Sequence, residues 1–331
     1  MKKLQIAYFG TPYFSAHFLE KLIKDTLLED SLPVEVKFVV TQPDKPVGRK
    51  QIITSTPVKQ VALENKIPVI EDLETFYASR LTLNDLDFAF LYAYSGIIPK
   101  EILHVPRFGF LNTHPSLLPK YRGPSPIAYP LIFGDDQTGV TLIKLDEEID
   151  HGPVLAQEKL EIKADDRRPD LEIKLTDLAY EMFKRLINEF ALSVHTERNQ
   201  SEVEGLKLKE QDHKKAIFTR KLTKQDGYIS LPVLQKTLKN EQFQTNKIPH
   251  LIENWKSKIK NSAKIIYDYF RGLYPWPGLW TLVTIKGQEK RLKITDVEYK
   301  HNQLVLKKVQ LEGKNEVDFK TFQTAYNLFT P

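Results

Sequence analysis

The stretch LQIAYFGTPYFSAHFLEKLI, residues 4–23, decides the fold class of this 331-residue chain. Its first part, Leu4–Phe9, is a short and almost continuous apolar run, as expected of a strand buried on both faces of a parallel sheet. Thr11 then has the position of a helix N-cap, with Pro12 as the first helical residue. Apolar side chains follow at the spacing of one helix face: Phe14, Phe18, Leu19, Leu22 and Ile23. A buried strand that leads directly into an amphipathic helix is typical of α/β domains.

The alternation of strand-like and helix-like segments continues through the first half of the chain. We expect strands at Val34–Val40, Ile67–Ile70, Asp87–Tyr92, Phe108–Asn112 and Gly139–Lys144. We expect helices at Pro57–Asn65 and at Asp170–Val194, where apolar residues recur at helical spacing. Strands that alternate with helices favour a doubly wound, mostly parallel sheet. The sequence therefore predicts an α/β fold with a Rossmann-like N-terminal domain over residues 1–195.

The composition and periodicity of the sequence change after this domain. Residues 196–213 are polar and lack periodicity, which predicts a linker. Beyond them we expect a helix at Lys256–Leu273 and short strands at Trp280–Ile285, Arg291–Val297, Gln303–Val309 and Val317–Phe319. Short strands with polar connections predict a small antiparallel barrel or sheet. Residues 214–331 are therefore expected to form a second, C-terminal domain.

Charge is distributed unevenly along the chain. Residues 1–200 carry 24 Lys and Arg against 29 Asp and Glu, a net charge of −5, whereas residues 201–331 carry 24 against 14, a net charge of +10. A basic domain beside an acidic one indicates a module that meets polyanions such as nucleic acid. The alternative is a lysine-rich solvated surface, and charge alone leaves both interpretations open.

Composition excludes several classes of protein. The chain has no Cys, which rules out a disulfide scaffold, a Cys-ligated metal or iron–sulfur site and a thiol nucleophile. No pair of its eight His has the HxxxH spacing of a helical metal site, so no metal is expected. No apolar run approaches the ~18–20 residues that a membrane span needs. We expect a cytoplasmic protein with no membrane partner, and nothing in the sequence demands more than a monomer.

The turn after the first strand argues against a dinucleotide cofactor. A Rossmann domain that binds dinucleotides carries G-x-G-x-x-G here, but Gly10 is the only glycine of the run from residue 10 to residue 15. Without the second and third glycines, neither a close approach to a pyrophosphate nor tight packing of the helix is encoded.

Asn112 and His114 are the most informative pair of polar residues. They leave the end of an expected strand two residues apart, so their side chains can point the same way. The carboxyl ends of strands in open α/β sheets are where ligands bind. An amide and an imidazole side by side can donate hydrogen bonds to one developing oxyanion. The alternative is a hydrogen-bonded Asn and a satisfied His that cap a turn, and spacing alone leaves both open.

Two loops add charged groups to the same region. The segment LDEEIDHGP, residues 145–153, holds four acids within five residues, and an acid near His114 would favour the protonated imidazole. The sequence does not say which acid reaches His114, and a solvated acidic loop is the alternative. The second loop, QPDKPVGRK, carries Lys45, Arg49 and Lys50, which can grip phosphates. A plain surface loop is the alternative there.

With these residues assembled, the chain resembles the methionyl-tRNA formyltransferase family, and the likeness covers nearly the whole chain. The matching stretches are IAYFGTPYFS (6–15), VVTQPDKPVGR (39–49), NTHPSLLPKYRG (112–123), TGVTLIKLDEEIDHGPVL (138–155), LTKQDGYIS (222–230) and FRGLYPWPGLW (270–280). The N-x-H-x-S-L-L-P segment with a downstream D-x-G is specific to folate-dependent formyltransferases. The PDKPVGR loop and the YPWPG segment narrow the resemblance to the tRNA enzyme.

The resemblance implies roles for particular residues. The catalytic Asn, His and Asp of the family fall on Asn112, His114 and Asp150. Its folate-contacting stretch falls on Ser116, Leu117, Leu118 and Pro119. Its tRNA-acceptor loop falls on about Thr41–Thr54, which makes Lys45, Arg49 and Lys50 the expected tRNA contacts. The family's second domain is an OB-like β-barrel that contacts tRNA, which agrees with the basic C-terminal charge.

The resemblance also implies the reaction and its partners. The formyl group of 10-formyltetrahydrofolate, the co-substrate, is moved to the amino group of methionyl initiator tRNA, for translation initiation. The alternatives are a formyltransferase that acts on an amino-sugar nucleotide, a formyl-folate hydrolase and a non-enzymatic RNA-binding protein. The first two would leave the basic half without a partner, and the last would not need Asn112, His114 and Asp150 to converge.

The chain departs from the family pattern at a few positions. His151 stands where the family usually has Thr, the loop after residue 121 reads RGPSP where RGAAP is commoner, and Pro115 replaces a small residue. Leu234–Asn261 matches no part of the family. Tyr274 and Trp276 offer stacking surfaces for bases, but for Trp276 we favour a core anchor between helix and barrel.

Overall fold

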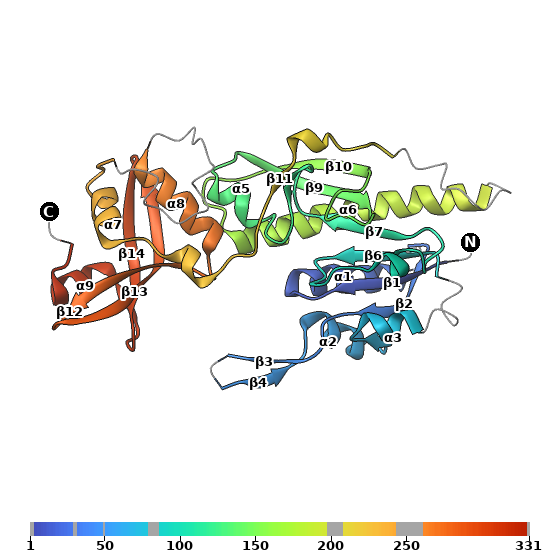
Figure 1. The fold of residues 1–331 in the computed structure, drawn as a ribbon, viewed down its shortest axis with the longest axis horizontal. Coiled ribbons are helices and arrows are strands. Elements are labelled where there is room, and N and C mark those ends of the chain that lie inside the picture. Colours follow the sequence, from blue (N-terminus) through green and yellow to red (C-terminus); the bar gives the residue numbers. More distant parts are fainter. Residues whose placement is uncertain are drawn as a thin grey trace. The chain divides into compact units, whose positions relative to one another are not determined.

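The computed structural model describes residues 3–28, 32–48, 50–78, 86–196, 208–242 and 261–329. These residues form two compact units (Figure 1). The first unit consists of Met1–Gly123, Thr138–Leu160 and Glu172–Phe218. The second consists of Pro124–Gln137, Glu161–Leu171 and Thr219–Pro331. The chain therefore passes between the units several times.

A seven-stranded sheet is the centre of the first unit. Its order is β10-β9-β7-β6-β1-β2-β5. The strands are β1 (Leu4–Gly10), β2 (Val34–Val40), β5 (Val69–Ile70), β6 (Phe88–Tyr92), β7 (Phe110–His114), β9 (Gln137–Lys144) and β10 (Val154–Glu161). The pairs from β5 through β2, β1 and β6 to β7 are all parallel. The expectation of an α/β fold with a mostly parallel sheet is confirmed.

Helices cover both faces of this sheet. They are α1 (Tyr13–Thr26), α2 (Pro57–Glu64), α3 (Leu73–Ala78), α4 (Lys100–Leu103) and α6 (Arg168–Thr196). Neighbouring side chains of β1 point to opposite faces: Tyr8 stacks on Phe18 of α1, whereas Phe9 packs edge-on against Phe76 of α3. Phe18 also contacts Phe183 of α6. The helices α1 and α6 thus share one face, and α3 lies on the other.

The start of α1 differs from the prediction. Pro12 is the N-cap and the helix begins at Tyr13, so the expectation of Thr11 as N-cap is wrong. The Thr11 hydroxyl is buried and has no hydrogen-bond partner among the described residues, so it does not cap the helix. Gly10 is required in this turn because a Cβ there would lie 2.0 Å from the Ser15 Oγ.

One strand of the first unit has a direction that the sequence did not reveal. β9 is antiparallel to β7, with His114 opposite Thr141 and Leu111 opposite Lys144. β9 lies between β7 and β10 in the sheet. β10 is the edge strand on this side, and it was not expected as a strand. The carboxyl end of β9 therefore lies at the amino end of β7.

Smaller elements complete the first unit. The loop after β2 forms a hairpin of β3 (Lys45–Val47) and β4 (Ile52–Thr54). The short strand β8 (Lys120–Arg122) pairs in parallel with β11 (Ile217–Phe218), which follows the 3₁₀ turn His213–Lys215. The expected linker falls partly on residues 197–207, which lie outside the described residues. Residues 208–213 belong to the first unit.

A four-stranded antiparallel sheet organises the second unit. Its strands are β12 (Leu279–Ile285), β13 (Gln288–Lys300), β14 (Gln303–Leu311) and β15 (Glu316–Asp318), in that order. Its helices are α5 (Ala128–Ile132), α7 (Leu231–Leu238), α8 (Ser262–Leu273) and α9 (Phe319–Tyr326), with a 3₁₀ turn at Lys224–Gly227. Within the described residues the sheet is not closed into a barrel. The predicted helix from Lys256 is described from Ser262 onward.

The core of the second unit does not include Trp276. Its apolar cluster contains Val283, Leu292, Val309, Leu311 and Phe322. Trp276 is 52% exposed, so the expectation of a buried anchor at this position is wrong.

No helix within the described ranges is both long enough and apolar enough to cross a lipid bilayer.

Candidate active site

The end of β7 carries two of the predicted site residues. Asn112 and His114 alternate with Thr113 along the strand, so both face the same side of the sheet. Both residues are buried: Asn112 is 6% exposed and His114 is 4% exposed. A polar group at this depth is costly unless it is hydrogen-bonded, so the partners of these two residues matter.

Asp150 reaches the pair through a loop that has to turn back. Because β9 is antiparallel to β7, Lys144 lies beside Leu111, and the chain from Leu145 must return along β7 before Asp150 can meet His114. Asp150 has a left-handed backbone, with a φ of 50°. Such a conformation is uncommon for residues other than Gly, Asn and Asp, and it needs support from the surrounding structure.

Gly152 explains the glycine of the D-x-G motif. A Cβ at this position would lie 1.9 Å from the carbonyl oxygen of Lys144. The loop therefore passes so close to the end of β9 that only a glycine fits. This close approach is held by the hydrogen bond from the Lys144 N–H to the Pro153 carbonyl.

The carboxylate of Asp150 joins the three predicted catalytic residues. Its Oδ1 lies 3.3 Å from the Nδ1 of His114 and accepts a hydrogen bond of 3.3 Å from the Nδ2 of Asn112. Its Oδ2 accepts a hydrogen bond of 2.7 Å from the backbone N–H of Gly123. The structure thus brings Asn112, His114 and Asp150 together around one carboxylate.

The partners of His114 favour the imidazolium. Its Nε2 lies 2.9 Å from the carbonyl oxygen of Tyr121, which can only accept, and its Nδ1 faces the Asp150 carboxylate. Both ring nitrogens therefore meet acceptors, and only the protonated ring supplies two N–H donors. Burial lowers the pKa of His114, but the charge and hydrogen bond of Asp150 outweigh it and hold this pKa above its usual value.

Asp150 is perturbed in the complementary direction. Burial disfavours its charge, yet the facing His114 and the Gly123 N–H hold the pKa of the Asp150 carboxyl below its usual value. Arg122 also favours the ionised carboxylate, and it opposes the protonation of His114. An ionised Asp150 beside a protonated His114 is the state that these contacts stabilise.

The amide of Asn112 can serve a second acceptor. A side-chain amide nitrogen carries two hydrogens, and the contact with Asp150 uses one of them. The other can donate to an oxygen that gains negative charge next to His114. The arrangement can therefore stabilise an oxyanion and hold a proton near it.

Two residues outside the predicted set support the Asp150 loop. The side-chain N–H groups of Gln211 donate to the carbonyl oxygens of Asp150, His151 and Gly152, at 2.9, 3.0 and 2.8 Å. The Oε1 of Gln211 accepts a hydrogen bond of 2.7 Å from the Nη2 of Arg122. Gln211 lies in the segment predicted to be a linker, where no local pattern marks it.

His213 adds a further contact to the same network. Its ring stacks on His151 with the ring centroids 3.9 Å apart, and its Nδ1 lies 2.8 Å from the Nη2 of Arg122. The Nδ1 of His151 in turn lies 2.6 Å from Asp146. His151, the departure from the family pattern, therefore joins Asp146 to the His213 and Arg122 side chains.

The predicted folate-contacting stretch follows β7. Ser116 is fully buried, and its hydroxyl donates to the carbonyl of Lys120 within the turn. Leu118 is also buried, and its backbone is held by Thr141 and Gln157. Leu117 and Pro119 are partly exposed and are the members that keep apolar surface available.

Two of the three predicted tRNA contacts, Lys45 and Lys50, lie in the β3–β4 hairpin. Lys45 and Lys50 are exposed, and the Nζ of Lys45 donates to Gln42. Arg49 lies outside the described residues. Exposed apolar side chains share the hairpin with these cations: Val47, Ile52 and Ile53.

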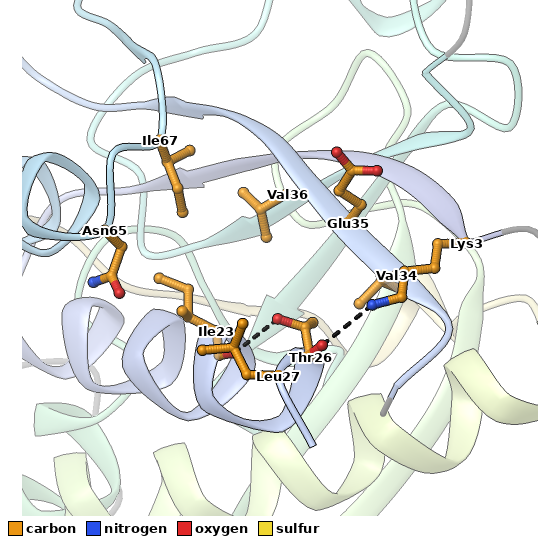
Figure 2. A pocket seen from close by; sticks show the side chains of 9 residues that line it. All are labelled: Lys3, Ile23, Thr26, Leu27, Val34, Glu35, Val36, Asn65 and Ile67. Carbon is orange, nitrogen blue, oxygen red and sulfur yellow. Dashed lines mark hydrogen bonds between the residues drawn. The ribbon is translucent and has the colours of Figure 1, made fainter. Parts of the chain in front are cut away.

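A cavity elsewhere in the first unit is separate from this site. It measures about 300 Å³ and is lined by Lys3, Ile23, Thr26, Leu27, Val34, Glu35, Val36, Asn65 and Ile67 (Figure 2). Figure 2 shows Lys3 reaching the carbonyl of Thr26, with a distance of 3.2 Å. Lys3 and Val34 lie at the amino ends of β1 and β2, whereas His114 lies at the carboxyl end of β7. Because these strands are parallel, the cavity and the site are at opposite ends of the strands.

No group of three or more His, Asp and Glu able to hold a metal ion is found among the residues that the structure describes. The groups gathered around Asp150 are arranged for hydrogen bonding and proton binding instead.

The fold and this arrangement define a formyltransferase. Residues 4–187 match the family model described as formyl transferase. Among solved structures, a 4-N formyltransferase from Francisella tularensis superposes with a TM-score of 0.58 at 16% identity, over 89% of this chain and 98% of that one. An N-formyltransferase from Helicobacter canadensis, solved with folinic acid and dTDP-3-aminofucose, gives a TM-score of 0.52 at 18% identity, over 93% and 94%. At such identities these likenesses concern the fold.

A curated relative narrows the class. The methionyl-tRNA formyltransferase of Caldicellulosiruptor saccharolyticus is 33% identical over 98% of this chain and 98% of its own length. The chain belongs to the methionyl-tRNA formyltransferase family.

Proposed function

We propose that this protein transfers the formyl group of 10-formyltetrahydrofolate to the amino group of methionine on initiator tRNA, in translation initiation. The observation that carries the proposal is the end-to-end match to a methionyl-tRNA formyltransferase in a chain that gathers Asn112, His114 and Asp150. The reaction forms a bond from the amine nitrogen to the formyl carbon and breaks the bond from that carbon to the folate nitrogen. The amine loses one proton, and the folate nitrogen gains one as tetrahydrofolate leaves.

Asn112 and His114 bind the formyl oxygen as it gains negative charge. The second N–H of the Asn112 amide donates to this oxygen, and the imidazolium of His114 provides a positive charge beside it. Asp150 keeps His114 protonated and accepts the proton that the amine loses, directly or through water. An α-amino group has a pKa of ~7.7–8.0, so a useful fraction is neutral and ready to attack near neutral pH.

The residues present fit a formyl-folate as co-substrate. Its formyl carbonyl is an acceptor, and the end of β7 offers an amide donor from Asn112 and the positive charge of His114 within one contact network. Leu117 and Pro119 provide apolar surface in the next turn of the chain, and the stretch from Ser116 through Leu118 to Pro119 is assigned to the folate. When bound, the co-substrate supplies the activated formyl group.

Basic residues of two regions are assigned to tRNA. Lys45, Arg49 and Lys50, which follow β2 in the sequence, contact the acceptor end. Residues 214–331 form an OB-like, tRNA-binding domain with the net positive charge of the C-terminal half. Residues 1–195 form the catalytic domain, and residues 196–213 lead from it to the second domain, with residues 208–213 still packed in the first unit. The protein acts in the cytoplasm as a monomer. Binding energy far from the reacting atoms serves to position the amine.

An acceptor panel tests the proposal. The protein is incubated with 10-formyltetrahydrofolate and, in separate reactions, methionyl initiator tRNA, uncharged initiator tRNA and a dTDP-linked amino sugar. Mass spectrometry of the acceptor and absorbance of the released tetrahydrofolate follow the reaction. We expect formylation of the charged tRNA alone, and its loss in His114→Ala.

Other outcomes would identify the alternatives. Formylation of the amino sugar would indicate a sugar-nucleotide enzyme. Equal release of tetrahydrofolate with charged and uncharged tRNA, and no formylated product, would indicate a hydrolase. Binding of tRNA by folded protein without any turnover would contradict the proposal and indicate an RNA-binding protein.

A further inference from the structure

The segment 208–213 takes part in building the site instead of merely connecting two domains. Lys209 pairs with Val154 at the start of β10 through two backbone hydrogen bonds, of 2.8 and 2.9 Å. This pairing places Gln211 against the loop that carries Asp150. Gln211 is only 7% exposed, so its amide has left water and needs partners in the protein.

Gln211 has a set of partners that fixes one loop conformation. Its Nε2 lies within 3.0 Å of three successive carbonyl oxygens, those of Asp150, His151 and Gly152. An amide nitrogen has two hydrogens, so these bonds are shared and require the three carbonyls to converge. Three successive carbonyls converge only when the backbone turns sharply, and Asp150 has the left-handed φ of 50° that makes this turn.

Arg122 holds the other end of the Gln211 amide. Its Nη2 donates to the Oε1 at 2.7 Å and its Nε at 3.3 Å, which orients the Gln211 side chain with its N–H groups toward the loop. Arg122 is also adjacent to Gly123, whose N–H donates to the Asp150 carboxylate. Gln211 and Gly123 therefore hold the backbone and the carboxylate of the same residue from two sides.

We propose that Gln211 is a positioning residue for formyl transfer, which holds the backbone of Asp150 in the turn that directs its carboxylate at His114. The proposal rests on the proposed function of this site and adds a residue that makes no contact with the reacting groups. Removing the Gln211 donors leaves the three carbonyl oxygens of the turn without their donor. Asp150 then moves away from the 3.3 Å contact with His114. His114 then loses the neighbour that keeps it protonated.

The proposal is tested with the full chain and two variants that divide the functions of the amide. Gln211→Met keeps the length of the side chain and removes both its donor and its acceptor. Gln211→Glu keeps the acceptor for Arg122 and removes the donors to the loop. Gln5→Ala is the matched control, because the Gln5 amide also donates to a backbone carbonyl, in this case that of Lys3. Gln5 lies near the amino end of β1, whereas His114 lies at the carboxyl end of β7.

The first readout is the protonation of His114, which needs no substrate. The His114 Hε1 signal is assigned by its absence in His114→Ala and followed by NMR against pH. We expect Gln211→Met to lower the pKa of His114 and Gln5→Ala to leave it unchanged. Two charged groups act on His114, namely Asp150 and Arg122. Both are retained in these variants.

The second readout is catalysis by variants that remain folded. We expect kcat to fall roughly 10- to 100-fold in Gln211→Met. Losses of this size are typical in metalloenzymes when a residue that orients a metal ligand is removed, and Gln211 orients Asp150 in a comparable way. KM for either substrate should stay within about twofold, since Gln211 touches neither. Gln211→Glu should lose kcat as well, because the donors to the loop are what matter.

Specific results would overturn the proposal. If Gln211→Met keeps the wild-type pKa of His114 and the wild-type kcat, Gln211 does not position Asp150. If Gln211→Glu retains wild-type kcat, the amide serves only as a partner for Arg122, and the proposal is also wrong. A wild-type protein that formylates no tRNA would contradict the proposed function, whereas the NMR titration would still decide the role of Gln211.

Discussion

Asp150→Asn separates the charge of the acid from its shape. The substitution keeps the side-chain volume, so Gly123 can still donate to the remaining oxygen, but His114 loses a negative charge 3.3 Å from its Nδ1. At an effective dielectric constant of about 20, a charge pair at this distance interacts with ~5 kcal/mol, before the cost of burial is subtracted. Because burial lowers the pKa of His114, the variant ring should titrate below its usual value.

The expected loss follows from the protonated fraction of His114. A His with a pKa of ~6.5 or less is at most ~10% protonated at about pH 7.5, so turnover of the variant there is at most ~10% of its value with the ring fully protonated. The loss of the proton acceptor lowers turnover further by a factor that does not depend on pH. Acid conditions reprotonate His114 in the variant, so the ratio of variant to wild-type kcat should rise as the pH is lowered from about 7.5 to 5.5.

The assay is single-turnover formylation of methionyl initiator tRNA at a series of pH values. The ratio of the two rates is used because protonation of the substrate amine affects both proteins equally. His114 should stay protonated to a higher pH in the wild type than in the variant, since its pKa is raised, and Asp150 should stay ionised to a lower pH than an ordinary Asp, since its pKa is lowered. A ratio that does not change with pH, in a variant with wild-type thermal stability, would refute this reasoning.

Further substitutions test other parts of the account. Asn112→Ala removes an oxyanion donor and should lower kcat ~10²–10³-fold with little change in KM, as measured by steady-state kinetics; unchanged kcat would exclude that role. Gly152→Ala forces a Cβ toward the Lys144 carbonyl and should destabilise the protein by about 1–3 kcal/mol in urea unfolding, whereas wild-type stability would mean the loop can relax freely. Lys45→Ala combined with Lys50→Ala should reduce the slope of log Kd for tRNA against log salt by about 2 in filter binding, and an unchanged slope would place the hairpin away from phosphates.

Local patterns were sufficient for the parallel strands of the central sheet. The apolar runs of β1 and β6 and the periodic face of α1 each reflect burial on a sheet with helices on both faces, which leaves a direct trace in the sequence. Val34–Val40 was predicted with the bounds that β2 has in the structure. Ends of helices were less reliable, because Pro12 takes the N-cap position that Thr11 was expected to hold.

The direction of β9 was not accessible in the same way. A strand buried on both faces has the same apolar composition whether it is parallel or antiparallel to its neighbour. Its reversal places the start of the Asp150 loop at the far end of β7, and the loop then needs a left-handed turn and a close approach at Gly152. The D-x-G pattern was visible in the sequence, but the physical reason for it was not.

Gln211 and Trp276 show the limits of local interpretation. Gln211 lies 61 residues from Asp150, in a polar stretch without periodicity, so only the folded chain reveals that it binds the Asp150 loop. Trp276 was expected in the core because prolines flank it, yet burial depends on what packs around the turn, and about half of this residue is exposed.

Formylation of methionyl initiator tRNA by the wild type and by His114→Ala, compared in one single-turnover experiment, tests the central claim most directly. The account predicts a formylated methionyl product with the wild type and a rate lower by roughly 10²–10³-fold with the folded variant. A variant that reacts as fast as the wild type would contradict the account, and so would a wild type that leaves the methionyl amine unmodified.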